Sequence, residues 1–155
     1  MRFITIVTLL AAASSALVAQ QPKTFASAAD VQALAEKAKQ TRKADQPTFS
    51  QPILQLSPYS ANLESRTAVG PASIHEKEAE MFYVIEGSAT LVTGGKLVNE
   101  KRTGDNLSGT AVEGGTTRQV TKGDFVMVPE NTAHWFSKID GTLQLMSLHL
   151  PHGAK

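Results

Sequence analysis

Hydrophobic and polar residues follow different patterns before and after Pro47. Before it, Val31, Leu34 and Ala38 recur at the spacing of one helix face, which predicts an amphipathic helix over about residues 28–42. The apolar stripe of this helix is thin and rich in alanine. The helix can therefore cover a sheet or a partner, but it cannot form a core by itself.

After Pro47, the apolar residues form short, partly alternating runs that are separated by Gly, Pro, Asn and Asp. Runs of this length that are rich in β-branched and aromatic residues predict β-strands. Many short strands after one helix, with no internal repeat, indicate an all-β sandwich or barrel. The predicted strands cover residues 53–56, 59–65, 81–86, 88–93, 97–98, 117–120, 125–128, 133–137 and 143–150.

Glycine-containing segments predict where these strands end. Gly87 separates two strands, residues 93–96 have the composition of a hairpin turn, and Asp140 with Gly141 predicts the turn of the last hairpin. Residues 99–115 are polar and rich in Gly, Asn and Thr, which predicts a long, loosely structured loop.

The N-terminal residues have the layout of a secretory signal peptide. Arg2 provides a positive start, residues 4–13 an apolar core too short to span a bilayer, and residues 14–19 a run of mostly small residues. We expect cleavage of residues 1–19 near Ala19, which makes the protein secreted or periplasmic. The alternative is a buried N-terminal helix or strand. The predicted divisions after the signal are a lead-in with the helix, the β domain and a polar tail, at residues 20–46, 47–150 and 151–155.

The charge of the chain is balanced. It has 15 Lys plus Arg and 14 Asp plus Glu. Removal of residues 1–19 takes away Arg2 and no acidic residue, so the basic count falls from 15 to 14 and the mature chain is formally neutral. This balance gives no support for a nucleic-acid or membrane partner. The chain has no cysteine, which excludes disulfides, thiolate metal sites and thiol nucleophiles.

Two stretches carry side chains that could share a metal ion. Residues 75–87 contain His75 and Glu80 before an apolar, aromatic run, and residues 123–136 contain a predicted strand, a proline, a short turn and His134. Two imidazoles and one carboxylate are the ligand types of a metal site with open positions. The sequence has no Walker loop, dinucleotide-binding glycine pattern or nucleophile elbow.

These stretches resemble the two motifs of the cupin superfamily, whose members are double-stranded β-helix, or jelly-roll, barrels. Gly123, Pro129 and His134 fall on the positions of the second motif. Asn131 replaces the inner glycine of that motif, and asparagine also tolerates a left-handed backbone; Lys138 replaces the final asparagine. The resemblance implies an all-β cupin barrel with one short N-terminal helix.

The first motif is incomplete, because the chain has one histidine where the family has two. Glu80 and Gly87 keep the spacing of the family. In one register His75 takes the second histidine position and Ser73 stands at the first. In the other register His75 takes the first position and Lys77 replaces the second. We prefer the first register because it needs no deletion between the ligands, but both lack one of the usual four.

The resemblance implies a metal site made of His75, Glu80 and His134, which would hold one divalent transition metal ion such as Mn, Fe, Zn or Cu. The alternative is that a site without its fourth ligand has also lost the metal and forms an empty polar pocket. Glu78 is expected to be solvated.

Further residues are candidates for the same pocket. Ser73, His75 and Lys77 would share one face of a strand, although a solvated lysine is the commoner case. His149 could supply the missing ligand from the last strand, and His152 is a weaker candidate.

The resemblance permits two functions of different classes. The first is a metal-dependent enzyme that acts on a small organic molecule by dioxygenase, decarboxylase, isomerase or lyase chemistry; the sequence identifies no catalytic residue. The second is a metal-free binding module for a small ligand such as a sugar or an organic acid. The resemblance also implies a homodimer, in which the helix from Ala28 to Arg42 is the candidate contact.

Overall fold

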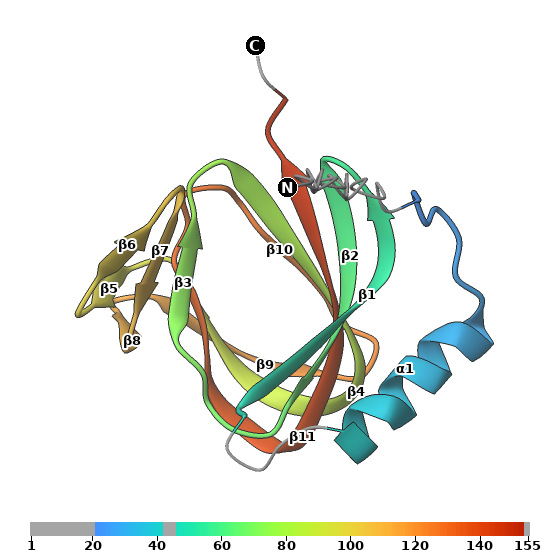
Figure 1. Cartoon of the computed structure of the whole chain (residues 1–155). Helices are drawn as coiled ribbons and strands as arrows, with labels where there is room; N and C mark the ends of the chain where they lie inside the picture. The colour runs from blue at the N-terminus through green and yellow to red at the C-terminus, as the bar shows by residue number, and fades with distance from the viewer. Residues whose placement is uncertain (1–20, 42–45, 154–155) are drawn as a thin grey trace, which may run out of the picture.

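The computed structural model describes residues 21–41 and 46–153 of the chain. The predicted signal peptide, residues 1–19, and the last residue of the predicted helix, Arg42, lie outside this range. Within it, one helix lies against the outside of a β-barrel (Figure 1). None of the described helices combines the length and the apolar character needed to cross a membrane.

The elements are α1 (Ala28–Thr41), β1 (Thr48–Leu56), β2 (Tyr59–Arg66), β3 (Ala72–His75), β4 (Glu78–Thr93), β5 (Lys96–Val98), β6 (Lys101–Thr103), β7 (Asn106–Gly109), β8 (Ala111–Glu113), β9 (Thr116–Thr121), β10 (Phe125–Val128) and β11 (His134–Pro151).

The N-terminal helix α1 has a reciprocal cap at its start. The N–H of Asp30 donates to Ser27 Oγ at 3.1 Å, and the N–H of Ser27 donates to Asp30 Oδ2 at 2.8 Å. The alanine face of α1 is buried, with Ala35 and Ala38 in one cluster with Leu63 of β2. The prediction of one amphipathic helix is confirmed, and its alanine face packs on the sheet.

The two longest strands, β4 and β11, form the centre of the barrel. They pair antiparallel from one end of the barrel to the other, β11 also pairs with β2 and β3, and β4 also pairs with β9 and β10. Gly87 lies inside β4 with φ 88°, and the register of β11 shifts between Asp140 and Gln144. The predicted strand break at Gly87 and the predicted hairpin at Asp140 and Gly141 are therefore wrong. Both are irregularities within continuous strands, because glycine serves bulges and tight turns alike.

The segment 99–115 is not a loose loop. It contains β6, β7 and β8, of which β7 extends the main sheet beside β3 and β8 pairs with β5 (Figure 1). Residues 93–96 accordingly connect β4 to this second sheet and do not close a hairpin between β4 and β5. The polar side chains gave no strand pattern, whereas the backbone groups that form the ladder are the same for every residue type except proline.

The core of the barrel is apolar, and the candidate site lies at its margin. Phe82 and Phe136 form an edge-to-face pair with ring centroids 5.3 Å apart. Side chains alternate along β4, so Glu80 lies on the same inner face as Phe82, one pleat earlier. The buried residues of this core cluster are Phe82, Val84, Ala89, Leu91, Val120, Val128, Phe136, Leu143 and Leu145.

Candidate metal site

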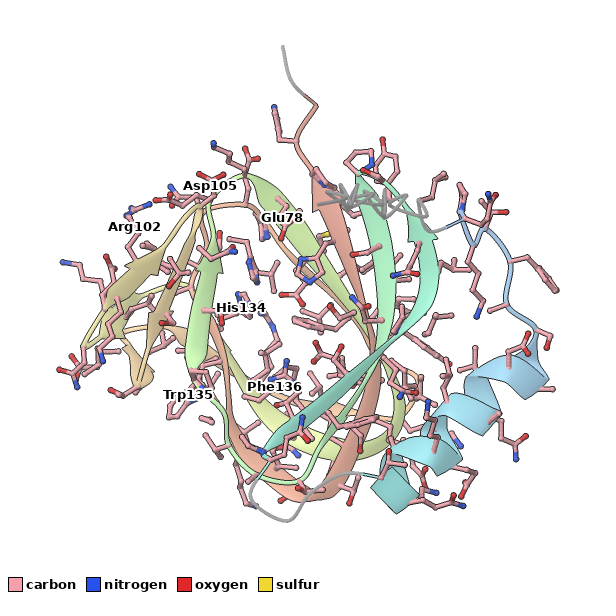
Figure 2. All side chains as sticks on the ribbon, in the orientation of Figure 1. Glu78, Arg102, Asp105, His134, Trp135 and Phe136 are labelled. Atoms are coloured by element: carbon pink, nitrogen blue, oxygen red, sulfur yellow. The ribbon has the colours of Figure 1, made fainter. Side chains whose placement is uncertain are left out.

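Three strands bring the predicted ligands together at one end of the barrel interior. His75 ends β3, Glu80 lies near the start of β4 and His134 opens β11. The N–H of Asn131, at φ 57°, donates to the carbonyl oxygen of His75 at 2.7 Å, which fixes the turn before His134 against β3. Figure 2 shows His134 and Phe136 inside the barrel.

Both histidines present the same ring nitrogen to the same carboxylate oxygen. His75 Nε2 lies 3.2 Å from Glu80 Oε2, and His134 Nε2 lies 3.1 Å from it. The other carboxylate oxygen, Oε1, accepts a hydrogen bond from the hydroxyl of Ser147 at 2.5 Å. Ser147 therefore holds Glu80 by Oε1, and Oε2 faces the two imidazoles.

The second nitrogen of each ring has its own oxygen partner. His134 Nδ1 lies 3.3 Å from the backbone carbonyl of Thr132, and His75 Nδ1 lies 2.7 Å from Asn106 Oδ1. A carbonyl oxygen only accepts, so Nδ1 of His134 carries the hydrogen and its Nε2 carries the lone pair of the neutral ring. Nδ1 of His75 donates to Asn106 Oδ1 in the same way. Such partners orient ligand histidines in metal sites.

The donor set fits a metal ion. A neutral Nε2 lone pair that faces a carboxylate oxygen at this distance is repelled unless a cation, either a proton or a metal ion, lies between them. Two ligands that are each about 2.1 Å from a common ion lie about 3.0 Å apart at a right angle and about 3.4 Å apart at the tetrahedral angle. The two observed N–O distances of 3.1 and 3.2 Å fall between these values. The chain therefore has a His/Glu/His triad that could bind a metal.

Charge and hydrogen bonding shift the pKa of two members of the triad. Burial by itself would raise the pKa of Glu80, but hydrogen bonds with His134, His75 and Ser147 outweigh it and hold that pKa well below the ordinary range. The pKa of His75 is raised, first by its hydrogen bond with Glu80. The metal-free site therefore favours an ionised carboxylate beside a protonated His75.

These two pKa shifts predict how the stability of the metal-free protein depends on pH. The contribution of Glu80 is lost as pH falls from the ordinary glutamate pKa of about 4.3 towards its lowered value. The contribution of His75 is complete below about pH 6.5 and is lost as pH rises through its raised pKa. With chelator present, we expect a higher free energy of unfolding at about pH 5.5 than at about pH 8.5, measured by urea denaturation. His75→Ala should weaken this decline; equal stability at both pH values in the unaltered protein would contradict the prediction.

The other candidate residues have different positions. Lys77 follows the end of β3, is 73% exposed and pairs with Asp105 at 3.0 Å, so it does not share the face of His75. Ser73 does share that face and pairs across the ladder with His134. His152 lies outside the site and pairs with an exposed carboxylate.

His149 lies close to the triad, together with a carboxylate that was expected to be solvated. Its Nδ1 lies 2.7 Å from Glu78 Oε1, and Glu78 is only 27% exposed. The expectation of a solvated Glu78 is therefore wrong. His75, Glu78 and His149 form a second group of ligand types, which shares His75 with the triad.

Sequence reasoning missed two residues that position the triad, Asn106 and Ser147, and one that contacts His149, Glu78. Asn106 comes from the segment expected to be a loop, Ser147 from the last strand, and Glu78 from the run of acidic residues at the start of β4. Only Ser147 had a signal in the sequence, because it lies two residues before His149 on a predicted strand and therefore on the same face.

Comparison with known proteins agrees with this architecture. A family model described as "Cupin" matches residues 26–148. A solved structure of BH2720 from Bacillus halodurans is 15% identical, with a TM-score of 0.57 over 86% of this chain and 86% of that chain. KdgF from Halomonas sp. is 16% identical, with a TM-score of 0.52 over 72% of this chain and 86% of that chain. FeII HppE is 12% identical, with a TM-score of 0.52 over 70% of this chain and 54% of that chain. No curated protein gives a match.

Proposed function

This chain belongs to the cupin family, and from that premise we propose that it binds one divalent transition metal ion through His75, Glu80 and His134 and that it binds or transforms a small organic molecule there. The observation that carries the proposal is the convergence of two Nε2 atoms on one oxygen of Glu80, at 3.1 and 3.2 Å. The name of FeII HppE includes iron, so one protein of this fold is described with a metal of this class.

Some residues of the site would bind the ion, and others orient the binding residues. Glu80 would supply the negative charge, and its hydrogen bond from Ser147 leaves Oε2 as the oxygen that faces the histidines. Asn106 and Thr132 hold the two rings by Nδ1, so that both Nε2 atoms stay directed at the same point. A bound ion would polarise a coordinated oxygen of the substrate or lower the pKa of a bound water.

The predicted export of the chain would restrict the choice of metal. A protein that acquires its ion outside the cytosol meets the affinity order of divalent ions directly, and copper and zinc then compete well against iron and manganese. The proposed location is secreted or periplasmic, and the proposed assembly is a homodimer.

A second candidate function is a metal-free binding module. The observation that favours it is that both oxygens of Glu80 have partners in the chain, Ser147 on one side and two histidines on the other. One proton at the Nε2 atoms could take the place of the ion. In this case the pocket would bind a sugar or an organic acid without catalysis.

Elemental analysis separates the two candidates. We expect the protein, purified without chelator from the compartment to which it is exported, to contain about one transition metal ion per chain. His75→Ala and His134→Ala should each lower this content to a small fraction, because each removes one ligand of the triad. If metal is far below one ion per chain in the unaltered protein, and added Mn, Fe, Zn or Cu leaves its thermal stability unchanged, the metal-free module is supported instead.

A further inference from the structure

His149 has an arrangement similar to that of the two triad histidines, although its Nε2 faces the other oxygen of Glu80. Its Nδ1 lies 2.7 Å from an oxygen of Glu78, and its Nε2 lies 3.6 Å from Glu80 Oε1. In each of the three histidines, Nδ1 contacts an oxygen and Nε2 is directed at the carboxylate of Glu80. A histidine that only fills space needs no such arrangement.

The register of the sheet places His149 beside Glu80. The two residues are direct partners in the ladder between β11 and β4. Ser147, two residues earlier on the same face of β11, is fully buried and donates to Glu80. The rings of His149 and His75 lie edge to face with centroids 5.1 Å apart. His149 therefore joins the triad from a third side, between the buried Ser147 and the end of the barrel.

Glu78 gives His149 the partner that ligand histidines typically have. Since a carboxylate accepts from Nδ1–H, it fixes the tautomer in which Nε2 carries the lone pair, and it increases the basicity of that nitrogen. Glu78 and Glu80 lie on the same face of β4, two residues apart. Two neighbouring positions on one face of β4 therefore supply the proposed ligand carboxylate, Glu80, and the carboxylate that orients His149, Glu78.

We infer that His149 is the third imidazole ligand of the proposed ion, in place of the histidine that the first motif lacks, and that Glu78 is its positioning residue. This inference rests on the proposed function. It requires the His149 ring to move, since its Nε2 lies 3.6 Å from Oε1 of Glu80, whereas the Nε2 atoms of the triad lie 3.1 and 3.2 Å from Oε2. The His149 side chain is 22% exposed.

The test compares the full-length protein as exported with two matched variants. His149→Asn keeps a side-chain amide that can donate to Glu78 but has no atom equivalent to Nε2. His152→Asn makes the same change three residues later, in a histidine whose Nδ1 also faces a carboxylate, that of Glu130 at 3.1 Å, but which lies outside the site. Zinc affinity is measured by competition with a chromogenic chelator, and the number of coordinated nitrogens by electron paramagnetic resonance with Cu(II). Circular dichroism checks that each variant is folded.

We expect His149→Asn to weaken zinc binding by at least about 10-fold, because loss of an outer-sphere partner alone costs about 10- to 100-fold. The Cu(II) spectrum of His149→Asn should show one coordinated nitrogen fewer, whereas His152→Asn should match the unaltered protein in both measurements. An unchanged nitrogen count in His149→Asn would overturn the inference, whether or not its affinity falls, and leave the proposed function intact. Failure of the unaltered protein to bind zinc or copper would overturn the proposed function and the inference with it.

Discussion

Replacement of Glu80 by glutamine is expected to weaken zinc or copper binding by more than about 100-fold, the upper end of the loss seen when only an outer-sphere partner is removed. Glutamine keeps the shape of the side chain and an oxygen that can accept from Ser147. It removes the negative charge, and it places an amide nitrogen where Oε2 now faces both histidines. An amide N–H group donates to an imidazole lone pair and does not bind a cation.

Glu76→Gln is the matched control for this experiment. It makes the same substitution four residues earlier, in an acidic residue that pairs with Arg102 on the outside of the barrel. Figure 2 shows Arg102 on the outside, away from His134. Metal affinity measured by chelator competition should be unchanged in Glu76→Gln. Equal affinity in Glu80→Gln and the unaltered protein would contradict the triad.

The same variant also tests the origin of the pH dependence of the metal-free protein. In Glu80→Gln the carboxylate that raises the pKa of His75 is absent. The decline in stability between about pH 5.5 and about pH 8.5 should therefore become smaller, since it depends on a proton held between His75 and Glu80. The decline in Glu76→Gln should be the same as in the unaltered protein.

Gly87→Ala is expected to lower the free energy of unfolding by about 2–5 kcal/mol, the sum of a backbone cost of about 1–2 kcal/mol and an overpacking cost of about 1–3 kcal/mol. Gly87 has φ 88°, and a Cβ at this position would lie 2.1 Å from the carbonyl oxygen of Thr142. Thr142 lies in the irregular part of β11, next to the buried Leu143. The two bent strands approach each other so closely here that a methyl group requires the backbone to move.

Gly94→Ala separates the two contributions. Gly94 has a similar φ of 76°, but a Cβ there would have no atom within 4 Å. This control should therefore cost only the backbone term, about 1–2 kcal/mol. The free energies of unfolding of both variants are measured by urea denaturation at one pH, with chelator present so that no metal is bound. If Gly87→Ala and Gly94→Ala are equally destabilised, the close approach of β4 and β11 contributes nothing.

The last strand, β11, shows what local sequence can and cannot predict. Alternating apolar residues on both sides of Gly141 predicted strands correctly, but the turn between them was predicted as a hairpin. Both halves in fact pair with β4, one on each side of the bend at Gly87. A hairpin and a bulge require the same local backbone freedom. Only the partner strand distinguishes them, and it lies many residues away in the chain.

The segment 99–115 shows the same limit for polar residues. Its side chains have no periodicity that predicts strands, yet β7 pairs with β3 and places Asn106 on His75. Pairing of the backbone with an existing strand edge supplies the stabilisation, and this does not depend on apolar side chains. The residue that orients one proposed ligand was therefore hidden in the part of the chain with the weakest local signal.

The sequence by itself determined the class of the fold and the three residues of the candidate triad, because strand-length runs, glycine turns and the spacings within the two motifs that carry His75, Glu80 and His134 are local properties of the chain. Tertiary structure alone decided which oxygens hold each ring and which further histidine stands beside them. Those contacts depend on the register between β11 and β4 and between β3 and β7, and a shift of one residue would turn His149 and Asn106 to the opposite face. Register is set by the whole barrel, through its bends and its buried core, so local spacing does not contain it.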